Sequence, residues 1–112
     1  MDAFNLHIAN VSWGKEGKRR PVLILSQKGD TVAVFKITTQ YQSKSEAIRS
    51  NFFAINDWKE SGLNKPSFID VGEVVGVSLA LIGTRPIGKL SNHDKIRLEK
   101  FLAGHIGTAS RK

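Results

Sequence analysis

Two hydrophobic segments separated by a short turn limit the possible folds of this chain most strongly. The first, residues 22–25, follows Pro21, and proline is tolerated at the first position of a strand. Its valine, leucine and isoleucine side chains are typical of a strand buried on both faces. The second, residues 31–38, is rich in residues with high β propensity. Residues 28–30 contain the glycine that a hairpin turn needs, so we expect the two strands to pair and form the core.

Shorter strand-like segments lie on both sides of this hairpin in the sequence. Apolar and polar residues roughly alternate over residues 6–13, which predicts a half-buried first strand. Residues 52–55, 66–70 and 74–82 have the composition of further short strands. About six short strands with turn signals between them predict a small β-barrel or a partly open roll.

Two polar segments are expected to be loops. Residues 14–20 contain two glycines and four positive charges, and residues 41–50 are mainly polar and charged. We expect the first segment to be flexible and the second to be mobile. Loops held by a rigid scaffold commonly carry binding residues, so both segments are candidates for contacts with a ligand.

One long helix is predicted near the C-terminal end. Ser91 is a suitable N-cap, and Asp94 falls in the first turn, where a negative charge suits the helix dipole. Leu98 and the apolar residues after it follow helical spacing and would pack on the sheet. A chain of 112 residues corresponds to one domain. We expect this domain over residues 1–107 and a frayed tail over residues 108–112.

The charge balance narrows the range of partners. Seventeen Lys and Arg residues stand against ten Asp and Glu residues, which gives a formal net charge of +7. A field of this sign attracts phosphate backbones and speeds their encounter, with a strong dependence on salt. An acidic protein would also be attracted, and many small basic proteins bind nothing specific. Charge alone therefore does not identify the ligand as a nucleic acid.

Residue types disfavour several classes of site. The absence of cysteine excludes disulfides, thiolate zinc sites and thiol nucleophiles. His7, His93 and His105 lack the spacing of metal ligands, and the sequence has no cluster of acidic residues for a two-metal nuclease. It has no glycine-rich phosphate loop either. We therefore expect neither a metal nor another cofactor.

The sequence also predicts where the protein acts. No apolar run reaches the roughly 20 residues that cross a bilayer. Asp2 stands where an export signal would carry basic residues, and a chain without cysteine fits a reducing compartment. We expect a cytoplasmic protein that has no membrane partner.

The predicted hairpin also predicts a site. In an antiparallel pair closed at residues 28–30, the start of the first strand lies beside the end of the second, so Arg20 should lie near Thr38. A guanidinium offers two parallel donors to phosphate oxygens and a hydroxyl adds a third. Such a site can stabilise the extra charge of a phosphoryl transition state without a metal. A simple contact to a phosphate backbone, or a charged loop beside a polar strand end, would use the same residues.

Several segments resemble those of the MazF/PemK toxin family. Residues 17–26 look like its first signature, in which a glycine-containing loop precedes an Arg-Pro pair and a hydrophobic strand. Residues 37–40 (Ile-Thr-Thr-Gln) resemble its second motif at the expected distance. Residues 87–102 are similar to its last strand and terminal helix, and residues 58–67 look like its PemK-like branch. The resemblance covers nearly the whole chain, and the order and spacing of the motifs are its most specific part.

The resemblance implies a fold and an activity. It implies a mostly β fold, an SH3-like small barrel with a C-terminal α-helix, in a homodimer without a cofactor. It implies cleavage of single-stranded RNA at short sequences. In that reaction the ribose 2′-hydroxyl attacks the adjacent phosphate and leaves a 2′,3′-cyclic phosphate and a 5′-hydroxyl. The family's catalytic arginine and threonine correspond to Arg20 and Thr38, and a cognate antitoxin protein would block the RNA groove.

Further residues acquire roles from the same resemblance. Some family members carry an acid in the loop before the arginine, and Glu16 stands close to that place as a candidate proton acceptor. Lys18 and Arg19 are interpreted as contacts to the RNA backbone. The remaining candidates for RNA binding are Thr39, Gln40, Lys44 and Arg85. Alternatively, Thr39 and Gln40 only complete the strand, and Arg85 only faces solvent.

Two other functions are compatible with the sequence. A toxin of the same fold poisons DNA gyrase by binding it, and that relative does not need the pair of Arg20 and Thr38. A non-catalytic RNA-binding module would keep the basic surface without cleaving. Cleavage of RNA in the presence of a chelator separates these functions from a ribonuclease.

Overall fold

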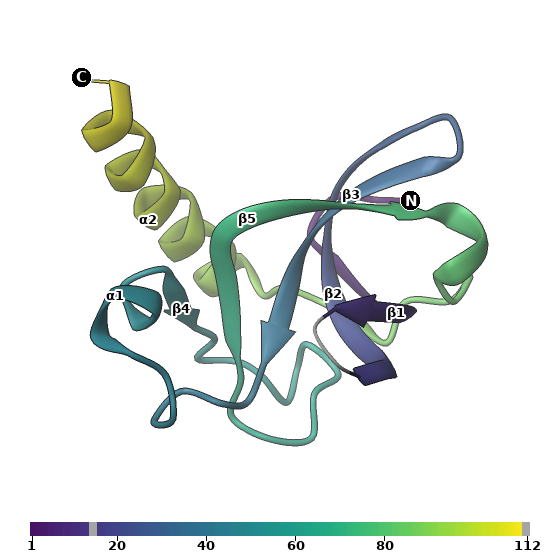
Figure 1. Ribbon diagram of the computed structural model, residues 1–112, viewed down its shortest axis with the longest axis horizontal. Coiled ribbons are helices and arrows are strands. Elements are labelled where there is room, and N and C mark those ends of the chain that lie inside the picture. Colours follow the sequence, from purple (N-terminus) through teal and green to yellow (C-terminus); the bar gives the residue numbers. More distant parts are fainter. Residues whose placement is uncertain (14–15, 111–112) are drawn as a thin grey trace.

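An antiparallel sheet and one long helix make up most of the computed structural model, which describes the backbone of residues 1–13 and 16–110 and the side chains of residues 1–10 and 19–105 (Figure 1). The six strands of the described residues are arranged in the order β4-β5-β3-β2-β1-β6. The elements are β1 (Asn5–Trp13), β2 (Glu16–Lys28), β3 (Thr31–Thr38), α1 (Glu46–Arg49), β4 (Phe52–Ala54), β5 (Phe68–Ser78), the 3-10 turn η1 (Leu79–Leu81), β6 (Gly88–Lys89) and α2 (Asn92–Ser110). This confirms the predicted mostly β fold with a C-terminal helix.

The β2–β3 hairpin forms the core of the sheet, as predicted. Gly29 adopts a φ of 61° in the turn, and Leu23 pairs with Phe35 across the two strands. Leu23 packs in one hydrophobic cluster, while its neighbours Val22 and Ile24 pack in a second cluster on the other face. All three side chains are fully buried, so β2 contributes to two cores at once.

The expected flexible loop over residues 14–20 is largely a strand instead. β2 begins at Glu16, and its first residues pair with β1 in a register that places Asn10 opposite Arg19 and Ala9 opposite Arg20. The prediction was wrong because glycines and positive charges at this position suggested a loop. The backbone pairing with β1 outweighs those local signals, and it holds residues 16–20 in an extended conformation.

Most of the two strands expected over residues 66–70 and 74–82 belongs to one continuous strand, β5, while residues 79–81 form the 3-10 turn η1 instead. The register of β5 against β3 shifts between Val34 and Lys36, because Val34 pairs with Val75 whereas Lys36 pairs with Asp70. β5 therefore advances by five residues while β3 advances by two, and the extra residues of β5 bulge out. Such bulges bend a strand and redirect its side chains.

The expected mobile loop over residues 41–50 contains a short helix. In α1 (Glu46–Arg49), Ser45 is the N-cap, and its Oγ accepts a hydrogen bond from the backbone N–H of Ile48 at 3.3 Å. Ser50 closes the helix by donating from its backbone N–H to the carbonyl of Glu46 at 3.0 Å. A serine N-cap ahead of an acidic residue is a helix-start signal. The loop was predicted because the segment as a whole is polar.

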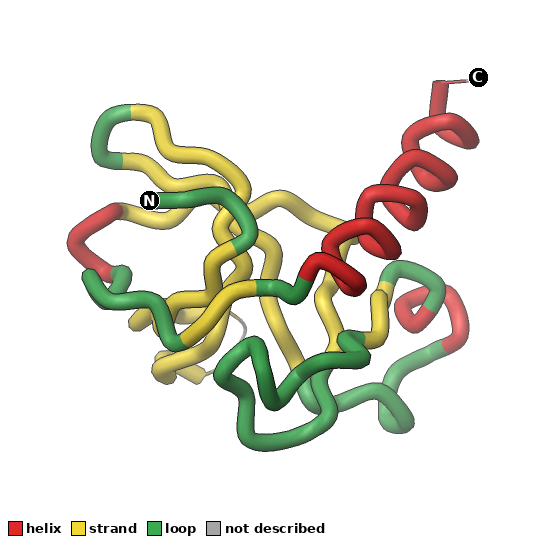
Figure 2. The backbone as a smooth tube through the Cα atoms, turned by 180° about the vertical axis from the view of Figure 1, so that it is seen from behind, coloured by secondary structure: helices red, strands yellow, loops and turns green. Residues whose placement is uncertain are grey.

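The C-terminal helix agrees with its sequence signals. Ser91 Oγ accepts from the backbone N–H of Asp94 at 3.1 Å, which confirms Ser91 as the N-cap. Leu98 is fully buried, and Phe101 packs against the same cluster. Later turns of α2 extend away from the sheet (Figure 2). Residues 108–110 fall within the bounds of α2 and residues 111–112 lie outside the described residues, so the frayed tail stays a prediction.

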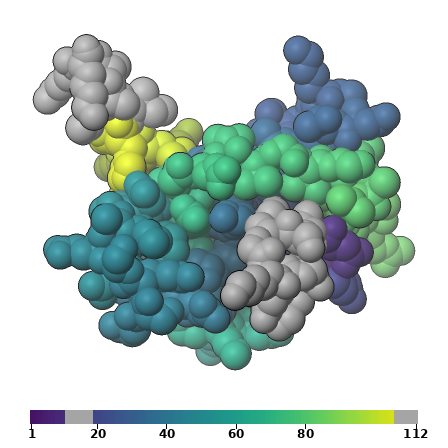
Figure 3. All heavy atoms as spheres, viewed as in Figure 1, coloured from purple at the N-terminus to yellow at the C-terminus, as the bar shows by residue number. Residues whose placement is uncertain are grey.

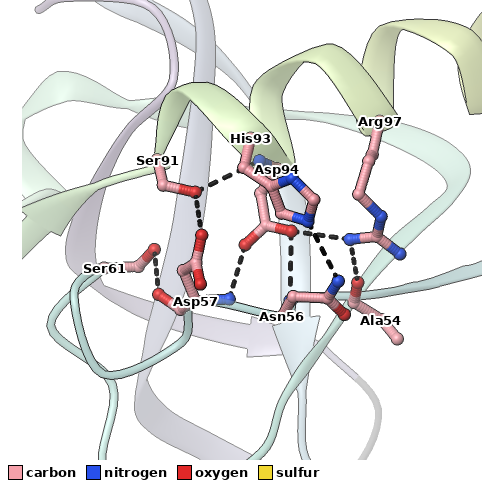
Figure 4. A network of polar contacts seen from close by, with 8 residues as sticks. All are labelled: Ala54, Asn56, Asp57, Ser61, Ser91, His93, Asp94 and Arg97. Carbon is pink, nitrogen blue, oxygen red and sulfur yellow. Dashed lines mark hydrogen bonds and ion pairs between the residues drawn. The ribbon is translucent and has the colours of Figure 1, made fainter.

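A buried carboxylate anchors the start of α2 to the rest of the domain (Figure 4). Asp94 has no solvent exposure. Its oxygens accept hydrogen bonds from the backbone N–H groups of Asn56 at 3.1 Å and Asp57 at 2.7 Å. Arg97 Nη1 donates to Asp94 at 2.6 Å and to the carbonyl of Ala54 at 3.1 Å. This network holds α2 against the segment that follows β4.

The two faces of the sheet around β3 and β5 differ in chemistry. Ile37, Phe53 and Ile69 point into the cluster that packs on α2. Side chains alternate between the faces of a strand, so Lys36 and Asp70, next to Ile37 and Ile69 in the chain, point to the opposite face. That face carries the candidate site.

Candidate functional site

A cavity of about 180 Å³ lies at the C-terminal end of β3. Its walls come from β2, β3, β4, β5 and the segment after β3. In the space-filling view the surface is hollowed between the green atoms of β5 and the teal atoms that follow β3 (Figure 3). The lining residues are Arg20, Lys36, Ile37, Thr38, Gln40, Lys44, Phe52 and Asp70.

Strand register explains why these side chains meet. Val22 on β2 pairs with Lys36 on β3. Because the strands are antiparallel, Arg20, two residues before Val22, lies across from Thr38, two residues after Lys36, and on the same face of the sheet. Both residues line the cavity. The structure therefore brings together the two residues that hairpin topology predicted to be neighbours.

The hydroxyl of Thr38 is held by the chain that follows it. Its Oγ1 accepts a hydrogen bond from the backbone N–H of Gln40 at 3.1 Å. A hydroxyl that accepts one bond still has its hydrogen to donate. Thr38 can therefore offer a donor to an anionic ligand in the cavity.

Cations outnumber acids among the described residues that line the cavity. Arg20, Lys36 and Lys44 line it together with a single described carboxylate, that of Asp70. Lys36 Nζ lies 3.9 Å from Asp70 Oδ2 and 3.9 Å from an oxygen of Glu73, whose side chain is 71% exposed. The Lys36 side chain is 26% exposed, so its ammonium group can be reached from solvent. Convergent positive charges in a concave site attract a phosphate group.

Sequence reasoning missed three residues of this cavity: Lys36, Phe52 and Asp70. Asp70 pairs with Lys36 of β3 and with Phe52 of β4, so it lies in the middle of the site. Its position in a predicted strand was visible in the sequence, but the neighbours of that strand were not. About thirty residues of sequence separate the end of β3 from the start of β5, and no local sequence signal predicts that the two strands pair.

A second, open groove of about 600 Å³ adjoins the cavity and shares Gln40 with it. The rings of Tyr41 and Phe68 stack in it with centroids 4.5 Å apart. Phe52, which lines the first cavity, lies 6.3 Å from each of these two rings. The groove is lined by Thr39, Gln40, Tyr41, Gln42, Ser43, Lys65, Pro66 and Phe68. Its aromatic rings and amide side chains suit a flat, polar ligand such as a nucleobase.

The other predicted site residues lie apart from the cavity or outside the described part of the chain. Thr39 lines the groove but not the cavity. Arg19 is exposed on β2 opposite Asn10, on the other side of the strand from Arg20. Arg85 is exposed in the segment beside β1 and does not line the cavity. The side chains of Glu16 and Lys18 lie outside the described residues.

The described residues contain neither a metal cluster nor a membrane-crossing helix. Among them, no group of three or more His, Cys, Asp and Glu side chains is arranged to hold a metal ion. None of their helices has both the length and the apolar character that crossing a membrane requires.

Comparison with known proteins identifies a family and shows structural similarity to solved proteins. The sequence model of a family described as PemK-like, MazF-like toxin of type II toxin-antitoxin system matches residues 4–106, which include both expected motifs and confirm the predicted resemblance. Among solved structures, the Mycobacterium tuberculosis toxin MazF-mt6 aligns with a TM-score of 0.69 at 24% identity, over 92% of this chain and 96% of that chain. This likeness shows a shared fold. Among curated proteins, none matches this chain.

Proposed function

Because this chain belongs to the family of PemK-like, MazF-like toxins of type II toxin-antitoxin systems, we propose that it is an endoribonuclease that needs no metal. Its substrate is single-stranded RNA, which it cuts at particular short sequences. The 2′-hydroxyl attacks the adjacent phosphate, and the products carry a 2′,3′-cyclic phosphate and a 5′-hydroxyl.

The observation that carries this proposal is the shared cavity of Arg20 and Thr38. A guanidinium donates two parallel hydrogen bonds to phosphate oxygens, and the Thr38 hydroxyl adds a third. These donors stabilise the charge that develops on the phosphoryl oxygens as the 2′-oxygen attacks. Lys36 and Lys44 add positive charge around the same position. Arg20 and Thr38 are therefore assigned as catalytic residues.

The path of the RNA follows from the positive and aromatic surface around the cavity. The scissile phosphate occupies the cavity, and Lys44 contacts it or its neighbour. The adjoining groove takes a base beside it, where Thr39 and Gln40 hydrogen-bond and Tyr41 stacks. Lys18, Arg19 and Arg85 contact the backbone further away, and Glu16 is a candidate proton acceptor.

Membership of a type II family implies a protein antitoxin as a partner. We place the antitoxin over the cavity and the groove, where it would exclude RNA. The active form is proposed to be a homodimer in the cytoplasm. A small acidic protein encoded beside this chain would support the antitoxin assignment, because its charge complements the net charge of +7.

The central test incubates the purified protein with a long single-stranded RNA in EDTA. We expect discrete cleavage products that polynucleotide kinase labels without prior phosphatase treatment, because their 5′ ends are hydroxyls. Arg20→Ala and Thr38→Ala should each lower the rate by about 10²- to 10³-fold, the usual effect of losing one transition-state donor.

Lys28→Ala is the charge control for these variants, because Lys28 is exposed at the far end of the β2–β3 hairpin. Intact RNA with the wild-type protein would overturn the proposal. Inhibition of DNA gyrase by the same preparation would then favour the gyrase-poisoning alternative. RNA binding without cleavage or gyrase inhibition would favour a non-catalytic binding module.

A further inference from the structure

We propose that Asp70 is the proton acceptor for the ribose 2′-hydroxyl. This inference rests on the proposed ribonuclease function and assigns the proton acceptor to Asp70 in place of the candidate Glu16. Arg20, Lys36 and Lys44 are cations at neutral pH, and they are unsuited to take a proton. Asp70 is the one acid among the described residues that line the cavity.

Strand pairing places this carboxylate in the middle of the site. Asp70 on β5 is flanked by Lys36 on β3 and Phe52 on β4. Thr38 lies two residues after Lys36 on the same face of β3, and it pairs with Phe68 of β5. A phosphate held by Arg20 and Thr38 therefore has the Asp70 carboxylate beside it, on the neighbouring strand.

The bulge in β5 fixes the orientation of the carboxylate. Two residues after Asp70, the backbone N–H of Gly72 donates to Asp70 Oδ1 at 2.9 Å. The backbone is tightly packed there, because a Cβ on Gly72 would lie 2.9 Å from the side-chain nitrogen of Asn51 and 3.2 Å from Asp70 Oδ1. One oxygen is therefore held by the main chain, while Oδ2 lies 3.9 Å from Lys36 Nζ.

The partial solvent exposure of the Asp70 side chain is suitable for a proton acceptor. Its side chain is 21% exposed, so the ligand can reach it while the walls of the cavity limit the water around it. A carboxylate has about four acceptor positions, and the bond from Gly72 uses one of them. The charged groups that face it are Lys36 on β3, Arg20 on β2, Lys44 after β3 and Glu73 on β5.

The proposed step conserves atoms and charge. Asp70 takes the proton of the 2′-hydroxyl while the 2′-oxygen forms a bond to phosphorus. The bond from phosphorus to the 5′-oxygen breaks, and that oxygen takes a proton from water. Asp70 then returns its proton to the solvent, which restores the carboxylate.

The test compares Asp70→Asn with Glu73→Gln. Both changes remove a carboxylate that lies 3.9 Å from Lys36 Nζ, but only Asp70 lines the cavity. We expect Asp70→Asn to lower kcat/KM by about 10²- to 10⁴-fold, the usual contribution of a general base. Glu73→Gln should cleave at nearly the wild-type rate. Binding of an all-2′-deoxy oligonucleotide, which has no nucleophile to activate, should differ less than threefold between wild type and Asp70→Asn.

The pH profile separates a proton acceptor from a structural residue. The rate of the wild-type enzyme should rise as the carboxylate ionises, and Asp70→Asn should lose that rise. Asp70→Glu keeps a carboxylate and should recover part of the rate together with the pH dependence, which also decides the matter if Asp70→Asn folds poorly.

Three results would overturn the inference. The first is an Asp70→Asn enzyme within threefold of wild type. The second is an Asp70→Glu enzyme without the pH dependence. The third is a loss of that dependence in Glu16→Gln instead. A wild-type protein that leaves RNA intact would overturn the ribonuclease function itself, which is a separate outcome.

Discussion

Lys36 and Asp70 face each other across β3 and β5, with Nζ and Oδ2 3.9 Å apart, in the cavity that Arg20 and Thr38 also line. The pair joins opposite charges where RNA is proposed to bind, and its partners are set by strand register. Replacing Lys36 removes a cation from the cavity, whereas replacing Asp70 removes its described carboxylate, so the two variants should behave differently toward an anionic ligand.

Lys36→Met should weaken RNA binding and lower its dependence on salt. The variant loses a cation in the cavity, and each phosphate contact to single-stranded nucleic acid contributes about 0.7 to the slope of log K against log salt. Fluorescence anisotropy with a labelled single-stranded oligonucleotide over a series of NaCl concentrations measures the slope. Lys28→Met is the control, and equal slopes for the two variants would show that Lys36 makes no phosphate contact.

Tyr41→Leu should weaken binding by about 5- to 150-fold, which corresponds to about 1–3 kcal/mol for one stacked base. The ring of Tyr41 lines the groove and stacks on Phe68. Tyr41→Phe keeps the aromatic ring and should bind within a few-fold of wild type. If leucine and phenylalanine at this position bind RNA equally well, no base stacks there. The measurement is a titration with a short single-stranded oligonucleotide.

Asp94→Ala should lower the free energy of unfolding by about 1–3 kcal/mol, because it removes the buried acceptor of two backbone N–H groups and of Arg97. Asp94 has no solvent exposure and accepts from Arg97 and from two backbone N–H groups. Glu99→Ala, an exposed change on the same helix, should cost less than about 0.5 kcal/mol. Urea denaturation followed by circular dichroism measures both, and a similar midpoint for the two variants would contradict the structural role.

Two glycine-to-alanine changes should have opposite effects on stability. Gly62 has a φ of +88°, and a Cβ there would lie 2.1 Å from the carbonyl oxygen of Ile87. Gly62→Ala should therefore lower the free energy of unfolding by more than about 1 kcal/mol. Gly104 lies in α2, and a Cβ added to it would meet no atom within 4 Å, so Gly104→Ala should raise that free energy by about 0.5–1 kcal/mol. Thermal melts of both variants give the signs directly.

The parts of the fold that depend on local sequence could be predicted. The turn at Gly29 and the helix start at Ser91 use signals contained within a few residues. The strand nature of residues 16–20 could not be predicted, because it depends on pairing with β1, which overrides glycine and charge. The polar segment after β3 likewise concealed α1, whose start depends on Ser45.

Only the part of the candidate site that depends on local sequence could be predicted. Arg20 and Thr38 lie on strands joined by a short turn, so their proximity follows from one hairpin. Asp70 reaches the same cavity through a pairing of distant segments whose register shifts at a bulge. A sequence pattern with a period of two says which residues share a face of one strand. It does not say which strand lies beside it.

The burial of β2 on both faces has a consequence for regulation. Two hydrophobic clusters on opposite faces of the sheet share this strand: Leu23 packs in one, and Val22 and Ile24 pack in the other. Arg20 lies on the same strand, two positions before Val22. Separation of this segment from the sheet would expose fully buried side chains of both clusters to water, and such exposure opposes local opening next to Arg20. If the proposed function holds, an antitoxin would inhibit this protein by covering Arg20 and Thr38. Its dissociation would then leave the proposed phosphate donors already in position.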